Sequence, residues 1–165
     1  MTMKESTFRD RDGNPIKWES FRRNKLNKVV VIIARMVPSE KYVLIKQFRP
    51  AVNHYVIGFP AGIVETGNVE DDALKELKEE TGYTGKIVES SPLLKSSPAS
   101  MDVDMQIVEV EIEESDPLNQ NPVQSLEPEE EIEVVLIKRE NIKQYILKEK
   151  ENGNQISAVL WYFLL

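Results

Sequence analysis

Cysteine is absent from this chain of 165 residues, and the only histidine is His54. The lack of cysteine excludes disulfides, cysteine nucleophiles and zinc sites built on thiolates. A bound metal would therefore need oxygen ligands or His54, and oxygen ligands are plentiful, because the chain has 28 Asp and Glu residues.

Long hydrophobic runs are also missing. No apolar stretch reaches the about 18 residues that a membrane-spanning helix needs. The N-terminal stretch MTMKESTFRDRDGNP lacks the apolar segment of a secretory signal. The sequence therefore predicts a cytoplasmic protein that does not enter a membrane.

Positive charge is scarce in most of the chain, whose net charge is −7. Residues 1–50 contain 12 Lys and Arg against 5 Asp and Glu, whereas residues 51–165 contain 9 against 23. An acidic surface repels nucleic acid and anionic membranes, so neither is expected as a partner. A basic patch facing an acidic, metal-binding patch would suit a small phosphorylated ligand, although these charges could also simply solvate the surface.

The length and the 41% hydrophobic content fit one domain, residues 1–165, with a basic N-terminal part at about residues 1–50. Short β-branched segments bounded by turn residues predict strands, and a weaker one spans 18–26. The predicted strands are 28–36, 42–48, 55–59, 86–90, 103–112 and 132–137, and the predicted helices are 69–81, 139–151 and 155–165. Their order predicts a mixed α/β fold of the α+β type, in which helices cover a mixed or antiparallel sheet.

Two loops, 91–101 and 113–131, are long for a compact domain, and loops of that length are often functional. The second contains the acidic run EPEEE, which could be a solvated surface segment or part of a site.

The helix predicted at 69–81 concentrates acidic residues at both of its ends. Those in its first turn, Glu70, Asp71 and Asp72, favour the positive end of the helix dipole and need no functional explanation. The core-facing arc of this helix is predicted to comprise Ala73, Leu74, Leu77 and Thr81.

The acids near the end of this helix have no such structural reason. Glu76, Glu79 and Glu80 follow the spacing i, i+3, i+4 on another arc, where like charges repel and oppose the dipole. Lys75 and Lys78 compensate in part, so a solvated helix end with local ion pairs is one interpretation. The other is a hard divalent cation bound by the carboxylates, joined by backbone carbonyls of the preceding turn PAGIVETG.

The segment KELKEETGY resembles the second half of the Nudix box, G-x5-E-x7-R-E-U-x-E-E-x-G-U, where U is a bulky apolar residue. The segment KQFRPAVNHYVIGFPAGIVETG is similar to the ADP-ribose pyrophosphatase branch of that family, as are KWESFRR and EEEIEVVLIKRENI. The resemblance spans about residues 10–165. It implies a Nudix-like mixed sheet sandwiched between helices, with an N-terminal antiparallel strand region. It also implies hydrolysis of a nucleoside diphosphate linked to another group, with ADP-ribose giving AMP and ribose 5-phosphate.

The resemblance also implies roles for individual residues. Mg²⁺, or Mn²⁺ in its place, would be bound by Glu76, Glu79, Glu80 and the main-chain carbonyl of Ala61. The catalytic carboxylates would be Glu130, with Glu131 and Glu129 as alternatives, together with Glu79.

Substrate-binding roles are implied for Trp18, Arg23 and Arg49. Trp18 would stack on adenine, although a buried core tryptophan is the rival interpretation, and the two arginines would contact the pyrophosphate or the terminal ribose. Arg22 is expected at the surface, and His54 could be an ordinary exposed imidazole. A homodimer whose N-terminal strands reach the second subunit is implied as well.

The sequence departs from the family pattern at three positions. The first half of the box reaches Asn68 instead of Glu and is one residue short, Lys75 replaces Arg, and Gly58 replaces the Glu of the related segment EFPAG. Asn68 suits a helix N-cap. These changes leave a second interpretation open, a nucleotide-sugar-binding module that has kept the fold and lost efficient catalysis.

Overall fold

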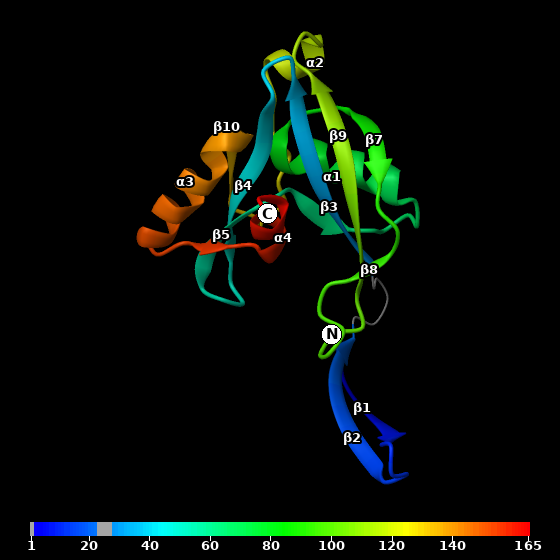
Figure 1. Cartoon of the computed structure of the whole chain (residues 1–165). Coiled ribbons are helices and arrows are strands. Elements are labelled where there is room, and N and C mark those ends of the chain that lie inside the picture. Colours follow the sequence, from blue (N-terminus) through cyan, green and yellow to red (C-terminus); the bar gives the residue numbers. More distant parts are fainter. Residues whose placement is uncertain (1, 23–27) are drawn as a thin grey trace.

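The computed structural model describes residues 2–22 and 28–165 and places eleven strands and four helices in them (Figure 1). The strands are β1 (Thr2–Arg9), β2 (Pro15–Arg22), β3 (Lys28–Val37), β4 (Lys41–Arg49), β5 (His54–Gly58), β6 (Ala61–Ile63), β7 (Lys86–Ser90), β8 (Leu94–Lys95), β9 (Asp104–Glu113), β10 (Ile132–Lys138) and β11 (Gln155–Ile156). The helices are α1 (Val69–Thr81), α2 (Pro117–Gln120), α3 (Arg139–Glu151) and α4 (Ala158–Phe163). The mixed α/β fold predicted from the sequence is therefore confirmed.

The main sheet splits where β3 and β4 separate. These two strands pair only at Arg35 and Tyr42, next to the turn that joins them. Further along, β5 pairs antiparallel with β4 and β6 pairs antiparallel with β3. The chain from β5 to β6 thus crosses the opening between the two halves of the sheet.

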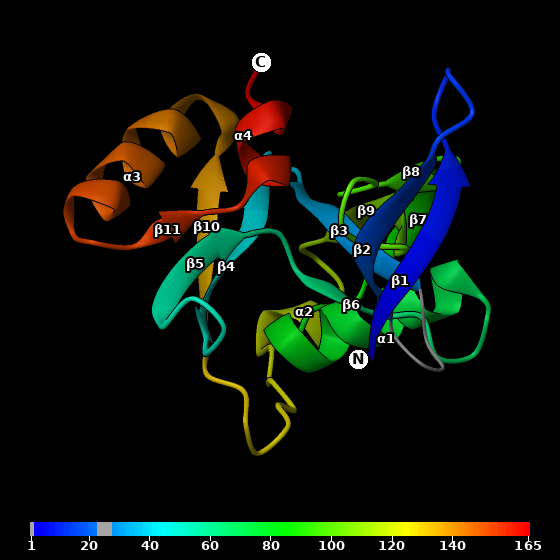
Figure 2. The ribbon, with the colours of Figure 1, turned by 90° about the horizontal axis from the view of Figure 1, so that it is seen from below.

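Helices cover the sheet on two sides, with α1 on one and α3 and α4 on the other (Figure 2). One apolar core joins α1 to β3 and β9, and its fully buried side chains include Ile32, Leu77 and Ile112. A second core joins α3 and α4 to β4 and β5 through Leu44, Ile146 and other residues. Alternating inward positions on β3 serve both cores, as expected for a strand covered on two faces.

Strands β1 and β2 form a separate antiparallel hairpin that extends away from the main sheet (Figure 1). Residues 18–22 of the weak strand signal at 18–26 lie in β2, and residues 23–26 lie outside the described residues. No strand was predicted at the position of β1. Isolated two-stranded hairpins are marginal in water, so this one requires support from the rest of the molecule or from a partner.

The single helix predicted at 155–165 is wrong. Gln155 and Ile156 instead pair in parallel with Val56 and Ile57, and the backbone N–H of Ser157 donates to the carbonyl of Ile57 over 2.9 Å. Only residues 158–163 are helical. Pairing with a distant strand overrides the local preference, which a sequence window cannot register.

Candidate active site

Helix α1 begins and ends at the residues that its sequence indicates. The side chain of Asn68 accepts the backbone N–H of Glu70 over 3.1 Å, so Asn68 is the N-cap. Gly82 adopts a left-handed conformation with φ of 79° and terminates the helix. The ammonium of Lys78 donates to the carbonyl of Gly82 over 2.6 Å, so this lysine neutralises the helix end rather than the glutamates.

The predicted core arc of α1 is correct, since Ala73, Leu77 and Thr81 are buried and Leu74 packs against the same core. Glu80 is buried as well, with 2% of its surface exposed. Its carboxylate accepts the backbone N–H of Ala61 over 2.9 Å. Helical spacing placed Glu80 beside Glu76 and Glu79, but it could not show that β6 would cover Glu80.

Burial and mutual repulsion raise the pKa of two of these carboxyl groups. Loss of solvation, reinforced by the charges of Glu79 and Glu130, raises the pKa of Glu76 to about 7. Burial also raises the pKa of Glu80 to about 8, although the N–H of Ala61 opposes that shift. The nearby positive charges of Lys75 and Arg49 therefore do not offset the loss of solvation of these two carboxylates.

Glu76 lies against the backbone of Gly62 on β6. A β-carbon at position 62 would come within 2.0 Å of the carboxyl carbon of Glu76, much closer than any real contact. Glycine is therefore required at this position by the close approach of the carboxylate. The sequence PAG predicted only a turn at Gly62, whereas the structure has the short strand β6 there.

Asp72 has a role that the sequence interpretation missed. It is 2% exposed, and one carboxylate oxygen accepts the backbone N–H groups of Glu65 and Thr66 at 3.0 Å and the Thr66 hydroxyl at 2.9 Å. Its assignment as a first-turn acid that only favours the helix dipole is thus incomplete. Asp72 fixes the loop between β6 and α1, and with it the approach of Glu65 to the site.

Glu76 and Glu79 line a cavity of about 480 Å³, whereas the buried Glu80 does not. The lining residues come from α1, β3, β6, the end of β4, the loop between β6 and α1, and the loop before β10. They are Val29, Arg49, Ala61, Gly62, Ile63, Glu65, Lys75, Glu76, Glu79, Ser125, Glu127 and Glu130. The cavity thus brings the predicted residues Arg49, Ala61, Glu76, Glu79 and Glu130 together.

The loop before β10 is anchored under the end of α1. The side chain of Gln124 donates to the carbonyl of Glu80 over 2.6 Å and to that of Ile132 over 3.2 Å. Glu130 accepts the backbone N–H of Glu127 over 3.0 Å and lines the cavity. Glu131 differs, because it accepts a hydrogen bond from the hydroxyl of Tyr55 and does not line the cavity.

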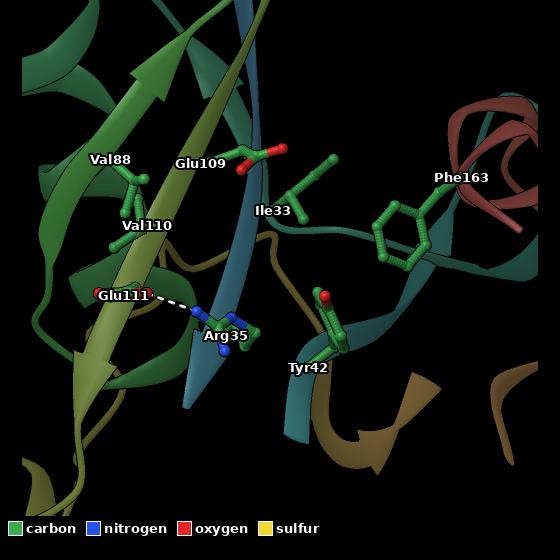
Figure 3. A pocket seen from close by; sticks show the side chains of 8 residues that line it. All are labelled: Ile33, Arg35, Tyr42, Val88, Glu109, Val110, Glu111 and Phe163. Carbon is green, nitrogen blue, oxygen red and sulfur yellow. Dashed lines mark hydrogen bonds and ion pairs between the residues drawn. The ribbon is translucent and has the colours of Figure 1, made fainter. Parts of the chain in front are cut away.

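A smaller pocket of about 60 Å³ lies between β3, β4, β9 and α4 (Figure 3). Two of its three charged groups are paired with each other, because the guanidinium of Arg35 binds Glu111 as well as Glu40. The larger cavity, in which several acids and the forked donor of an arginine face one space, has the features of a chemical site.

Comparison with known proteins agrees with this location. The model of the NUDIX domain matches residues 26–161. The chain belongs to the Nudix family. An ADP-ribose pyrophosphatase of Saccharomyces cerevisiae is 31% identical over 160 residues, which cover 92% of this chain and 69% of that protein.

Other relatives include a mouse ADP-sugar pyrophosphatase, 35% identical over 126 residues, which cover 72% of this chain and 58% of that protein. A crystal structure described as an ADP compounds hydrolase superposes with a TM-score of 0.63 at 19% identity, covering 86% of this chain and 74% of that one. That likeness supports the fold. The match to the NUDIX domain and the pyrophosphatases among the sequence relatives together identify this chain as a Nudix pyrophosphohydrolase.

Trp18, Arg22 and His54 do not line the cavity. Trp18 is on the hairpin, 49% exposed, and its indole N–H donates to the carbonyl of Ala99 over 2.7 Å. It is therefore not a buried core tryptophan. His54 is exposed at the start of β5 and contacts the carbonyl of Val52 over 2.7 Å. Arg23 lies outside the described residues, and Arg22 is exposed as expected.

Lys75 takes the position of the family arginine in the Nudix box. Its ammonium lies 3.2 Å from a carboxylate oxygen of Glu65 and 3.6 Å from one of Glu79, and these contacts raise the pKa of Lys75. Among residues 2–22 and 28–165, no three Asp, Glu or His side chains already converge as a metal site. The donors nevertheless suit a hard cation, because buried carboxylates with raised pKa values gain most from a positive ion.

Proposed function

We propose that this Nudix enzyme uses Mg²⁺ to hydrolyse the pyrophosphate bond of a nucleoside diphosphate linked to a sugar. The leading substrate is ADP-ribose, cleaved to AMP and ribose 5-phosphate. The observation that carries the proposal is the cavity in which Arg49 shares one space with Glu76, Glu79 and Glu130. The names of the yeast and mouse relatives support an ADP-linked substrate.

The metal ligands in this proposal are Glu76, Glu79, Glu80 and the carbonyl of Ala61, and Mn²⁺ could replace Mg²⁺. A divalent ion there would neutralise the pyrophosphate and stabilise the leaving phosphate. The N–H of Ala61, bonded to Glu80, keeps the strand and the buried acid together. Arg49, with its forked donors, would bind phosphate oxygens from the opposite wall.

Glu130 is the proposed residue that positions or deprotonates the attacking water. It lines the cavity, and its position is fixed by the N–H of Glu127. Glu131 and Glu129 are alternatives on the same segment, but Glu131 is engaged by Tyr55. Glu79 lines the cavity with 38% of its side chain exposed, so a water molecule could reach it.

The substrate's adenine is proposed to stack on Trp18 from a second copy of the chain. Phe8, Ile16 and Trp18 share one face of the hairpin and are all more than a third exposed. An exposed apolar surface of this kind on a two-stranded hairpin is typical of an interaction site. A homodimer would bring Trp18 of one copy towards the cavity of the other, while Arg23 remains a predicted phosphate or ribose contact.

The partners in this proposal are a nucleotide sugar and a second copy, with neither nucleic acid nor membrane involved. Within the described residues, no helix is long and apolar enough to cross a membrane. A cytoplasmic location remains a prediction from the sequence.

The test is turnover by the purified protein with Mg²⁺ and ADP-ribose, ADP-glucose, GDP-mannose, NADH or diadenosine polyphosphates. Hydrolysis of ADP-ribose to AMP is expected, and Glu80→Gln should reduce the rate by orders of magnitude without loss of fold. Glu130→Gln should reduce it far more than the matched Glu131→Gln. Absence of turnover with every one of these compounds would refute the proposed hydrolase activity.

A second candidate is a nucleotide-sugar-binding module, favoured by Asn68, Lys75 and Gly58. Tight ADP-ribose binding by calorimetry, with no product over hours in Mg²⁺ or Mn²⁺, would support it. Glu76, Glu79 and Glu80 argue for the enzyme, since a binding module would not need all three of them.

A further inference from the structure

A second cavity, of about 230 Å³, adjoins the catalytic one and opens into the gap between β3 and β4. The two cavities share Arg49 and Ala61 in their linings. The rest of the second cavity is lined by Val31, Ile45, Gln47, Val56, Gly58, Phe59 and Ser157. Arg49 is proposed to bind the pyrophosphate, and the carbonyl of Ala61 is proposed to bind the metal ion beside it. A group attached to that pyrophosphate could therefore enter this second cavity directly.

Gln47 is the unusual residue of this second cavity. It is 5% exposed, and its Oε1 has no hydrogen-bond partner among residues 2–22 and 28–165. Leaving a buried polar group unpaired costs roughly 1–3 kcal/mol, so such a group calls for an explanation. Isoleucine or valine would fill an ordinary core position on β4 without that cost.

Gly58 and Ser157 are neighbours in the lining of this cavity, because Ser157 follows β11, which pairs with β5. A β-carbon at Gly58 would lie 3.2 Å from the β-carbon of Ser157, so any side chain at position 58 would displace Ser157 and change this part of the lining. Gly58 is also where the sequence departs from the related segment EFPAG. The departure and the unpaired amide therefore concern the same cavity.

We propose that this cavity binds the sugar on the far side of the pyrophosphate, with a sugar hydroxyl bonded to the amide of Gln47. This inference rests on the proposed function and assigns part of its specificity to Gln47, Gly58 and Ser157. A volume of about 230 Å³ is below the roughly 300–1,000 Å³ of pockets for drug-sized ligands, so it suits one sugar ring and not a whole nucleoside.

A hydroxyl matches this site better than a charged group. The amide of Gln47 can present its oxygen or, turned over, its NH₂ group, and a hydroxyl can pair with either because it both donates and accepts. The apolar walls, among them Val31, Ile45 and Phe59, suit the C–H faces of a sugar ring and would make a buried charge costly.

The test compares ADP-ribose with the β-methyl ester of ADP, which keeps the nucleotide and the pyrophosphate but has no second sugar. In Gln47→Met, kcat/KM for ADP-ribose should fall roughly 3- to 10-fold, the effect of one lost hydrogen bond. The value for the methyl ester should stay within twofold. Ser157→Leu places a larger side chain in the lining of the cavity and should give the same selective loss. The control is Gln144→Met, which changes an exposed glutamine on α3.

Equal losses for both compounds, or no loss for either, would overturn the sugar site. If the wild type hydrolyses neither compound, the proposed function fails, and the cavity is then decided by calorimetry with the same pair. Tighter binding of ADP-ribose than of the methyl ester, with the difference reduced in Gln47→Met and Ser157→Leu, would support it. Equal affinities in the wild type would refute it.

Discussion

The carboxylate of Glu76 occupies the space that a side chain at Gly62 would need, since a β-carbon there would lie 2.0 Å from the Glu76 carboxyl carbon. This contact joins α1 to β6 at the cavity where both line the wall. It also places the Glu76 carboxyl group, whose pKa is raised by burial, beside β6, the strand that carries the proposed carbonyl ligand of Ala61.

Replacing Gly62 with alanine should displace Glu76 and reduce kcat/KM about 100-fold, because misplacing a catalytic group by about 1 Å can cost that much. The measurement is steady-state hydrolysis of ADP-ribose, with circular dichroism as the control for folding. In a Glu76→Gln background the same change should have little further effect, since the two residues act through one contact. Wild-type activity in Gly62→Ala would contradict the close approach.

Without metal, the protein should become less stable as pH rises from about 5 to 8. The folded pKa values of Glu76 and Glu80, about 7 and about 8, exceed the unfolded value of 4.5. Between these values the folded state binds more protons, so the free energy of unfolding falls as pH rises. Because each pKa unit corresponds to about 1.4 kcal/mol, a Tm decrease of several degrees in EDTA is expected.

Two changes should weaken this pH dependence. Glu80→Gln removes the more deeply buried acid and should flatten the plot of Tm against pH. Glu151→Gln, at the exposed end of α3, controls for the loss of one carboxylate away from the cavity. Saturating Mg²⁺ should raise Tm most at pH 8, where the acids are ionised and bind the ion. A Tm in EDTA that rises between pH 5 and 8 would exclude this account.

Asp72→Ala should destabilise the fold by about 1–3 kcal/mol, because the Glu65 and Thr66 N–H groups lose their acceptor. The neighbouring Asp71→Ala is a matched control. Asp71 is an exposed acid in the same helical turn, so its loss should cost about 0.3–1 kcal/mol through the dipole. Urea unfolding measures both, and equal losses would show that the loop contacts of Asp72 add nothing.

Mixing two inactive variants tests whether the hairpin of one copy serves the cavity of another. Trp18→Ala and Glu80→Gln should each be nearly inactive. After subunit exchange, half of the dimers would be mixed and hold one intact site, so about a quarter of wild-type activity should return. No recovery, despite verified exchange, would place Trp18 outside a shared site.

The arrangement of the acids on α1 was predictable because it depends on short-range sequence spacing. The arrangement Glu76, Glu79, Glu80 follows from helical periodicity, and Asn68 and Gly82 delimit that helix by local capping. Most strands were predictable for the same reason, since alternation and β-branched runs are local. The final helix was not, because the pairing of Gln155 and Ile156 with β5 involves residues about 100 positions away.

The sequence by itself determined the family, the acidic helix and the spacing of its acids, because these depend on residue identity at fixed spacing. Only the tertiary structure decided that Glu80 is buried, that Asp72 fixes a loop, and that Glu130 faces the cavity while Glu131 contacts Tyr55. It also decided that the side-chain oxygen of Gln47 is buried without a partner among residues 2–22 and 28–165, in the cavity that adjoins the one lined by Glu76 and Glu79. Burial and pairing of this kind arise from long-range packing, which residue spacing does not encode.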